Sequence, residues 1–241
     1  MQLNSNIITK TVSYADLGRI QYAKAWSLQE DLFNETVQRK ISNRNLSEAD
    51  QQPTSHHLLL CEHNPVVTLG KNADLKNLLI PEQGTDNVEV FHTNRGGDVT
   101  FHGPGQLVGY PILDLDEYYT DISRYLRNLE ETIIRTIAEY GIIGDRLPGA
   151  TGVWLDPNDP LRARKICAMG IRCSRWVTMH GFAFNVNCDL SYFGNIIPCG
   201  IVDKSVTSMQ KELNREVDMQ EVQQKLKGHL KNLFDFHFVN E

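Results

Sequence analysis

Cys199 has the setting that most favours covalent chemistry in this chain. It lies between Pro198 and Gly200 in the segment I-I-P-C-G-I, which predicts an exposed turn made mostly of backbone. A nucleophilic cysteine needs access and a lowered pKa, whereas a structural cysteine needs only apolar neighbours. The P-C-G setting leaves both interpretations open, a nucleophile and a structural thiol.

Lys165 is the candidate activator of such a thiol, because a nearby ammonium group favours the thiolate by charge. It opens the segment R-K-I-C-A-M-G-I-R, and the apolar residues that follow it predict a buried strand. The alternative is a solvated lysine at the end of a strand. Lys165 and Cys199 are 34 positions apart, and the sequence does not show whether they meet.

The segment from Arg95 to Tyr110, R-G-G-D-V-T-F-H-G-P-G-Q-L-V-G-Y, contains five glycines in sixteen residues. Glycine allows positive φ and lets a ligand approach the main chain closely. We interpret the segment as a loop that cradles a substrate. The alternative is a tight hairpin that turns at Gly103 to Gly105.

Two histidines, His102 and His180, each precede a glycine. Either could polarise a carbonyl or relay a proton, and either could instead shape a pocket through hydrogen bonds. The eight histidines show no zinc-binding spacing, and no dense set of carboxylates suggests magnesium. No metal site is therefore predicted. The glycine-rich segment also lacks the phosphate-binding pattern of P-loop proteins.

The net charge of −6 excludes general binding to nucleic acid phosphates. Five basic residues nevertheless fall within fourteen positions that contain no acid: Arg162, Arg164, Lys165, Arg172 and Arg175. They predict either a docking patch for an acidic partner or a solvated basic face.

The location predicted for the chain is the cytoplasm. No window approaches 18 consecutive apolar residues, so we expect no membrane span. Residues Met1 to Lys10 resemble neither a signal peptide nor a transit peptide. The five cysteines form no C-x-x-C pair, which favours free thiols in a reducing compartment.

These candidate residues must be positioned by a mixture of helices and strands. Apolar spacing predicts long helices over Arg19 to Ile41 and over Thr120 to Tyr140, the second ending at Gly141. The predicted strands are a pair within His57 to Leu69 turned at Asn64–Pro65, a strand on each side of the glycine-rich loop, and the runs Ala150 to Leu155, Lys165 to Arg172 and Val177 to Val186. Asn43 to Ser55 is predicted to be a surface loop, and the tail is predicted to form helices over Ser205 to Leu213 and Asp218 to Phe234.

Strands and helices alternate without regular βαβ units. This order predicts the α+β class, a mixed β-sheet flanked by helices, in preference to a doubly wound fold. Neither a repeat nor a change in composition marks a linker, so residues 1–241 are predicted to form a single domain.

The motifs together resemble the octanoyltransferases of lipoate biosynthesis, the lipoyl(octanoyl)transferases, from about Gly18 to Met209. The resemblance is carried by E-H-N-P-V-V-T-L-G-K, R-G-G-D-V-T-F-H-G-P-G-Q, T-G-V-W, K-I-C-A-M-G-I-R, H-G-F-A-F-N-V, P-C-G-I and V-T-S-M, in that order. Several independent motifs in one order are far more specific than a lone R-G-G.

The resemblance implies a cytoplasmic, cofactor-free acyltransferase with the fold of lipoate and biotin ligases. Such an enzyme moves an octanoyl group from octanoyl-acyl carrier protein to a lysine of lipoyl domains, in 2-oxoacid dehydrogenase complexes and in the H protein of glycine cleavage. It implies that Cys199 is the acyl-thioester nucleophile and that Lys165 lowers the pKa of that thiol. The implied substrate-binding residues are Arg95, Gly96, Gly97, Asp98, Val99, Thr100, Phe101, His102, Ala168, Met169, Gly170, Gly181, Phe182 and Ala183. The chain departs from the family pattern at Cys167 and in the length of the Asn43 to Ser55 loop.

Two further expectations concern the chemistry of such a site. The N–H groups of Gly96, Gly97 and Gly181 are candidates for stabilising a tetrahedral intermediate. A slot lined by Phe101, Met169 and Phe182 would suit an eight-carbon chain. Two rival interpretations stay open, an ATP-dependent lipoate or biotin ligase on the same fold and an inactive module that docks acyl carrier proteins.

Overall fold

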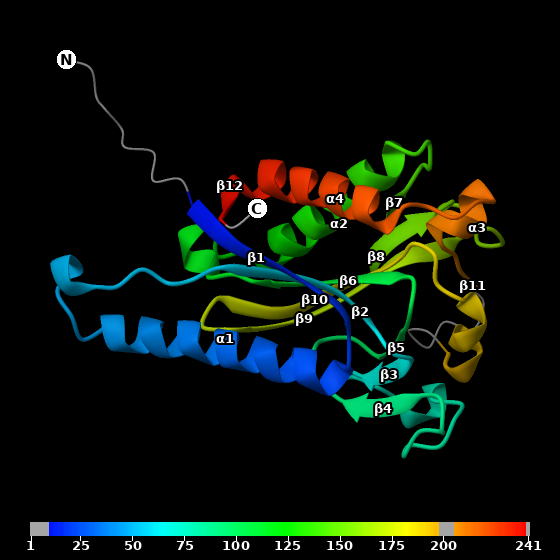
Figure 1. Cartoon of the computed structure of the whole chain (residues 1–241), viewed down its shortest axis with the longest axis horizontal. Coiled ribbons are helices and arrows are strands. Elements are labelled where there is room, and N and C mark those ends of the chain that lie inside the picture. Colours follow the sequence, from blue (N-terminus) through cyan, green and yellow to red (C-terminus); the bar gives the residue numbers. More distant parts are fainter. Residues whose placement is uncertain (1–9, 198–204, 240–241) are drawn as a thin grey trace.

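A mixed β-sheet lies at the centre of the molecule, with helices on both faces (Figure 1). A computed structural model describes residues 10–197 and 205–239. In these ranges nine strands form the main sheet in the order β12-β1-β2-β6-β10-β9-β8-β7, with β11 paired to β9. The strands are β1 (Lys10–Ile20), β2 (His57–His63), β6 (Gln106–Ile112), β7 (Asp145–Leu147), β8 (Ala150–Leu155), β9 (Arg164–Ser174), β10 (Val177–Asn185), β11 (Ser205–Val206) and β12 (Phe236–Val239).

Parallel and antiparallel pairs occur together in this sheet. Strand β1 is parallel to both β2 and β12, and β11 is parallel to β9. The remaining neighbours along the sheet are antiparallel. The predicted α+β class with a mixed sheet flanked by helices is confirmed, whereas the extent of a single domain over residues 1–241 stays a prediction.

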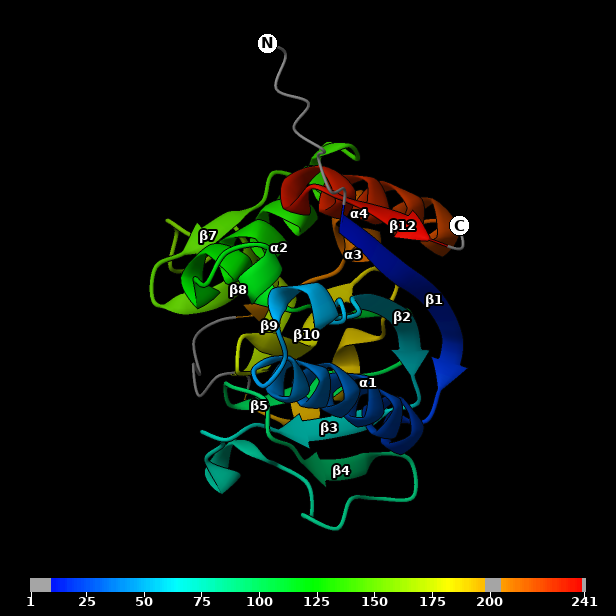
Figure 2. The same ribbon diagram turned by 90° about the vertical axis from the view of Figure 1, so that its left-hand side faces the viewer.

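Helices α1 (Tyr22–Asn43), α2 (Ile122–Ala138) and α4 (Met219–Phe234) cover the two faces, and α3 (Met209–Leu213) is short. In Figures 1 and 2 the strands lie between α1 on one side and the α2–α4 pair on the other. The run L-L-L-C in β2 shows why this arrangement forms. Leu58 and Leu60 belong to the core beneath α2 and α4, while Leu59 and Cys61 belong to the core beneath α1. A strand buried on both faces is apolar at every position rather than at alternate ones.

A second, smaller sheet carries the glycine-rich segment. Its order is β4-β3-β5, formed by β4 (Glu89–His92), β3 (Val66–Leu69) and β5 (Val99–His102). It packs through Val67, Leu69 and Phe101 against Phe193, which belongs to the 3₁₀ helix Leu190–Asn195. Further 3₁₀ turns are Glu48–Asp50, Leu75–Asn77 and Leu115–Glu117. Among the described residues, no helix combines the length and apolar character needed to cross a membrane.

The predicted helix Thr120 to Tyr140 is confirmed as α2. The Asp121 side chain accepts a hydrogen bond from the backbone N–H of Arg124 at 2.9 Å, which caps the first turn. At the other end Gly141 has φ +78°, the left-handed conformation that ends many helices. The predicted strands from Ala150 to Val186 are also present, each within two residues at either end.

Other boundaries differ from the sequence predictions. The first helix begins at Tyr22, and the preceding residues form β1, which was not predicted because Val12 is its one fully buried residue and gives no period of two. The predicted strand pair at Asn64–Pro65 is wrong, since β2 and β3 belong to different sheets. The predicted helix from Ser205 begins instead as β11, and β12 follows α4.

Candidate active site

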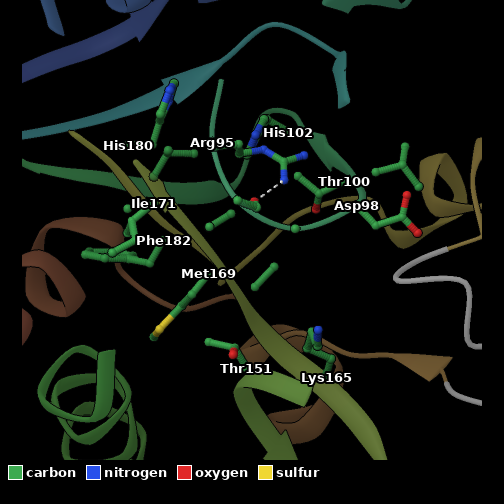
Figure 3. A pocket seen from close by; sticks show the side chains of 18 of the residues that line it. Arg95, Asp98, Thr100, His102, Thr151, Lys165, Met169, Ile171, His180 and Phe182 are labelled. Carbon is green, nitrogen blue, oxygen red and sulfur yellow. Dashed lines mark hydrogen bonds between the residues drawn. The ribbon is translucent and has the colours of Figure 1, made fainter. Parts of the chain in front are cut away.

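A cavity of about 390 Å³ lies between the glycine-rich segment and strands β9 and β10 (Figure 3). This volume is within the usual range of small-molecule sites. In Figure 3 Lys165 and Thr151 lie apart from Arg95 and His102, and Met169, Ile171 and Phe182 gather along one side. The cavity therefore has two polar regions and an apolar wall.

The R-G-G loop, defined here as Asn94–Asp98, forms part of one wall. Its carbonyl groups accept backbone hydrogen bonds from the residues after β3: Gly70 N–H to Asp98 O (3.1 Å), Lys71 N–H to Arg95 O (2.9 Å) and Asn72 N–H to Gly97 O (3.2 Å). A Cβ at Gly70 would collide with the Gly97 carbonyl, and Gly97 itself has φ +89°. Glycine is needed at both positions because the two chain segments touch through their backbones.

The Arg95 side chain is 7% exposed and turns back onto β3. Its Nη2 donates to the Thr68 carbonyl at 2.6 Å, and Nε and Nη2 donate to the Thr68 hydroxyl at 3.2 and 3.0 Å. Its Nη1 donates to the Gly96 carbonyl at 3.1 Å. The guanidinium is therefore fixed in direction by the strand beneath it, as a buried cation must be.

Two histidines near Arg95, His102 and His180, and His63 beside His102 are held in the neutral form. Burial, helped by the Arg95 charge, lowers the pKa of His180 to about 3, and burial lowers the pKa of His63 to about 4. Burial holds the pKa of His102 well below its ordinary value. His180 Nε2 and Asn94 Oδ1 are 2.7 Å apart, so His180 anchors the R-G-G loop to β10. Neutral imidazoles avoid placing further positive charge beside the guanidinium.

A β-bulge turns Lys165 toward the cavity. Val153 of β8 pairs with Cys167 of β9, but the next residue, Trp154, pairs with Lys165, so that Ile166 is an extra residue on β9. Ile166 and Cys167 both lie in the core beneath α2 and α4, whereas Lys165 lines the cavity. Bulges commonly re-aim a side chain beside an active site. The expectation that Lys165 enters a buried segment is confirmed, because it is 7% exposed.

Trp154 contacts the Lys165 ammonium group, and Glu130 holds the neighbouring strand β8 in place. The Lys165 Nζ lies 4.7 Å from the centroid of the Trp154 ring, within range of a cation–π interaction. Glu130, fully buried on α2, accepts a hydrogen bond from Gly152 N–H at 3.0 Å and pairs with Arg146 at 3.1 Å. This connection holds β8, the strand that pairs with β9 at Lys165, against α2.

The apolar wall is formed by side chains of β6, β9, β10 and α2. Met169, Ile171 and Phe182 are joined there by Val108 and by Leu126 of α2. The Phe182 ring lies directly over Gly109, where a Cβ would collide with it. Glycine at position 109 therefore leaves the space that the ring occupies.

Thirteen of the fourteen predicted substrate-binding residues line the cavity together with Lys165. The exception is Phe101, which is not among the described lining residues. Its ring stacks on Tyr192 at 5.0 Å between centroids and packs edge-on against Phe193. The predicted slot is thus formed by Met169 and Phe182 without Phe101.

The oxyanion expectation needs a correction at Gly96. The Gly96 N–H donates to the Ile171 carbonyl at 2.8 Å and joins the R-G-G loop to β9. A donor that is already engaged by the main chain is not available for a tetrahedral intermediate. Gly97 and Gly181 stay candidates.

Cys199 lies outside the described residues. The nearest described residues are Ile197, whose N–H donates to the Asn77 carbonyl at 2.8 Å, and Ser205, which begins β11. Val206 pairs with Lys165 and lines the cavity. The strand that follows residues 198–204 in the sequence therefore lies directly beside Lys165.

The other cysteines are free thiols at Cys61, Cys167, Cys173 and Cys188. Burial raises the pKa of each of these thiols above its ordinary value. Cys167, which the sequence left open, is fully buried in the core. A buried thiol with a raised pKa is a poor nucleophile, so Cys167 is structural.

The predicted basic patch does not form as one surface. Arg164 pairs with Glu212 and with Asp156, each at 2.6 Å, and Arg162 also pairs with Asp156. Lys165 faces the cavity, and the Arg172 guanidinium lies over the Phe33 ring. Acids distant in sequence neutralise part of the cluster, which a linear count of charges does not reveal.

Several lining residues were missed by the sequence analysis, namely Tyr22, Gln106, Val108, Tyr110, Leu126, Gly149, Ala150, Thr151, Ile171, Asn185, Phe193 and Val206. Asn185 carried a signal, since it is a polar amide within the predicted strand Val177 to Val186. Gln106 lay within the Arg95 to Tyr110 segment that we interpreted as cradling a substrate. Tyr22 and Leu126 carried none, because their helical spacing equally fits core packing.

Comparison with known families agrees with this geometry. The lipoyl protein ligase A/B catalytic domain model matches residues 21–231. The chain belongs to this family. An octanoyltransferase from Cytophaga hutchinsonii is 52% identical and covers 100% of this chain and 98% of its own length. An octanoyltransferase from Christiangramia forsetii is 55% identical over 94% of this chain and 97% of its own. The resemblance to octanoyltransferases is confirmed, and the chain is an acyltransferase.

Solved structures of lipoyl protein ligase relatives share the fold. Lipoate-protein ligase A bound with ATP has a TM-score of 0.66 at 14% identity, over 97% of this chain and 89% of that one. A structure from the analysis of a bi-partite lipoate protein ligase and its E2 lipoyl domain from Thermoplasma acidophilum has a TM-score of 0.64 at 14% identity, over 97% of this chain and 88% of that one. These likenesses confirm the predicted lipoate ligase-like fold.

Because the R-G-G loop contacts β9 closely, we expect that adding one methyl group at position 170 will lower acyltransferase activity strongly. In Gly170→Ala the new Cβ would lie 2.7 Å from the Gly96 carbonyl, so the loop must move and Arg95 with it. We expect acyltransferase activity to fall at least roughly tenfold, as small misplacements at active sites do, and the Gly96 amide to exchange its hydrogen faster. The matched control is Gly228→Ala on α4, where a Cβ meets nothing within 4 Å. Equal activity in both variants would contradict this account.

Because the buried histidines are neutral in the folded protein, we expect the folded state to lose stability at acid pH. A histidine whose pKa is lowered by folding stabilises the native state above the unfolded pKa, near 6.5, and this contribution is lost as pH falls toward the folded pKa. For His63 and His180 we therefore expect the free energy of unfolding to fall between pH 6.5 and about 4, by up to roughly 1.4 kcal/mol per pH unit and histidine. Denaturant titrations across this range measure it. A flat profile, or His180 ring signals that titrate near pH 6.5 in NMR spectra, would refute it.

Proposed function

We propose that this acyltransferase moves an octanoyl group from octanoyl-acyl carrier protein to a lysine of a lipoyl domain, through a thioester on Cys199. The observation that supports this most strongly is the position of Lys165. A buried ammonium group lines a cavity with an apolar wall, beside the strand that follows the Cys199 segment.

The proposed reaction has two balanced steps. The Cys199 thiolate attacks the thioester carbonyl of the donor, the thioester C–S bond breaks, and the carrier leaves as a thiolate that takes up a proton. The amine of the acceptor lysine then attacks the new thioester, the bond to Cys199 breaks, and the amine loses a proton. Thioester exchange is nearly balanced in free energy, and the amide formed in the second step is favourable.

In this proposal Lys165 favours the Cys199 thiolate through its charge. The low-dielectric surroundings of a lysine that is 7% exposed strengthen such an interaction relative to water. The acyl chain is expected along Met169, Ile171 and Phe182. Gly97 and Gly181 are the proposed donors to the tetrahedral intermediate.

The proposed partners are octanoyl-acyl carrier protein as donor and lipoyl domains of 2-oxoacid dehydrogenase complexes and of the glycine cleavage H protein as acceptors. We place the reaction in the cytoplasm and expect it to need no cofactor. The free thiols at Cys61, Cys167, Cys173 and Cys188 fit a reducing compartment. The T. acidophilum ligase that shares this fold is described together with its E2 lipoyl domain, which is consistent with such an acceptor.

Intact-mass spectrometry tests the acyl-enzyme. Incubation with octanoyl-acyl carrier protein should add the mass of one octanoyl group to the wild-type chain. Neutral hydroxylamine should remove it, because thioesters are cleaved under those conditions. The added mass should be absent in Cys199→Ala and present in Cys188→Ala, a matched change at a buried thiol.

Two outcomes would replace this proposal. Label that persists in Cys199→Ala would assign the nucleophile elsewhere. Transfer of free lipoate to a lipoyl domain with ATP, without label from octanoyl-acyl carrier protein, would identify an ATP-dependent ligase.

The role of Lys165 is tested by Lys165→Met, which keeps the length of the side chain and removes its charge. Without a neighbouring cation the thiol ionises at higher pH, so acylation should be slow at neutral pH and recover as pH rises. Stopped acylation reactions from pH 6 to 10 measure the shift. Lys24→Ala, a change at an exposed lysine of α1, serves as the control. Parallel pH profiles for wild type and Lys165→Met would remove Lys165 from the mechanism.

A further inference from the structure

A chain of buried hydrogen bonds crosses the wall of the cavity from Arg95 to Thr207. Beyond the contact of Arg95 with Thr68, the Thr68 hydroxyl lies 3.3 Å from His102 Nε2, and His102 Nδ1 lies 2.9 Å from Gln106 Oε1. Gln106 Nε2 donates to Asn185 Oδ1 at 2.9 Å, and Asn185 Nδ2 donates to the Thr207 carbonyl at 2.9 Å. The side chains come from four separate segments, β3, the R-G-G loop, β5–β6 and β10.

Backbone carbonyls fix the direction of this chain. Gln106 Nε2 also donates to the Phe101 carbonyl at 3.1 Å, so the nitrogen of the Gln106 amide must face Phe101. Asn185 must likewise present its nitrogen to the Thr207 carbonyl, which only accepts. The amide oxygens then face the remaining partners, and Gln106 Oε1 can only accept from His102.

The histidine tautomer follows from this direction. His102 must carry its proton on Nδ1, and its Nε2 is an acceptor. The Thr68 hydroxyl receives two N–H bonds from Arg95 and has one hydrogen to donate, which faces His102 Nε2. Each bond of this chain then joins a donor to an acceptor, so the imidazole is locked as the Nδ1–H form, the less common tautomer of a free histidine side chain.

The far end of the chain reaches the strand beside Lys165. The Thr207 N–H donates to the Lys165 carbonyl at 2.9 Å, and Val206 pairs with Lys165. The two amides therefore connect the support of Arg95 with the backbone that follows the Cys199 segment.

We propose that Gln106 and Asn185 are positioning residues for acyl transfer. Through the locked His102 ring they fix the position of the Arg95 side of the cavity relative to the β11 backbone beside Lys165. The proposal rests on the function proposed above, because the positioned backbone of β11 lies beside Lys165, the proposed activator of the thiol. Gln106 is 1% exposed and Asn185 is 4% exposed. Buried amides are costly unless their hydrogen bonds are made, which explains why all members of the chain are paired.

Both amides also line the cavity, so direct contact with the substrate is the competing role. The two roles differ in their kinetics. Loss of a substrate contact raises KM, whereas loss of alignment lowers kcat with KM little changed. The His102 tautomer tests separately whether the hydrogen-bond chain on which the positioning role depends is formed.

The first measurement needs no variant. In ¹⁵N NMR spectra of the wild-type chain at pH 7, His102 should show a protonated Nδ1 and an unprotonated Nε2, with the signal assigned by its loss in His102→Gln. An Nε2–H ring or an imidazolium would overturn the proposal.

The second measurement uses Gln106→Glu, which keeps the shape of the side chain but replaces its donor by an acceptor. The new carboxylate would face the Phe101 carbonyl and Asn185 Oδ1. If Asn185 rotates to donate to the carboxylate, its oxygen instead meets the Thr207 carbonyl, so one bond of the chain is lost in either arrangement. We expect kcat for octanoyl transfer to fall roughly tenfold to a hundredfold, with KM within about twofold of wild type.

Gln38→Glu, the same chemical change at an exposed position of α1, should match wild type. A raised KM with unchanged kcat in Gln106→Glu would assign a substrate contact and overturn the proposal, as would wild-type kinetics. If wild type itself transfers no octanoyl group, the proposed function fails and the positioning role fails with it, while the tautomer measurement still reports on the hydrogen-bond chain.

Discussion

A buried guanidinium is the constraint on which the rest of the cavity depends. Arg95 is 7% exposed, so its N–H groups must find acceptors within the protein. Thr68 and the Gly96 carbonyl provide them, and this requires the R-G-G loop to lie directly on the segment after β3. That contact between backbones in turn requires glycine at positions 70 and 170, where a side chain would meet loop carbonyls. The need for glycine at these two positions, which lie outside the R-G-G loop but touch it, thus follows from the burial of one charge.

Much of the site could be predicted from the sequence because its residues are grouped in short motifs. Consecutive lining residues come from three motifs: the glycine-rich segment, the strand after Lys165 and the H-G-F-A segment. Recognising each motif was therefore enough to predict most of its lining residues. Phe101 shows the limit of that reasoning. It lies within a motif whose other residues from 95 to 102 line the cavity, yet its ring packs against Tyr192 and Phe193. Membership in a motif does not determine which way a side chain points.

What the sequence could not show depends on long-range pairing. Strand β1 gives no period of two, and its place in the sheet is set by parallel partners that lie far along the chain, β2 and β12. The predicted basic patch is neutralised in part because Glu212, 48 positions away from Arg164, pairs with it. The bulge that turns Lys165 into the cavity is a mismatch between β8 and β9, and a mismatch exists only once two strands are paired. Each of these features is a property of two segments together.

The neutral histidines and the lysine around the cavity have different roles in the proposed reaction. His102 and His180 line the cavity and His63 lies beside His102, but burial keeps the pKa values of all three rings below the range in which a thiol and an amine exchange protons. Their neutral rings instead hold neighbouring groups in place through hydrogen bonds, His63 with the Ile20 carbonyl, His102 with Gln106 and His180 with Asn94. A protonated His102 would also carry a second N–H toward Thr68, whose hydroxyl already receives two from Arg95. Keeping these rings neutral preserves the support of the guanidinium and leaves Lys165 as the proposed source of positive charge for the thiolate.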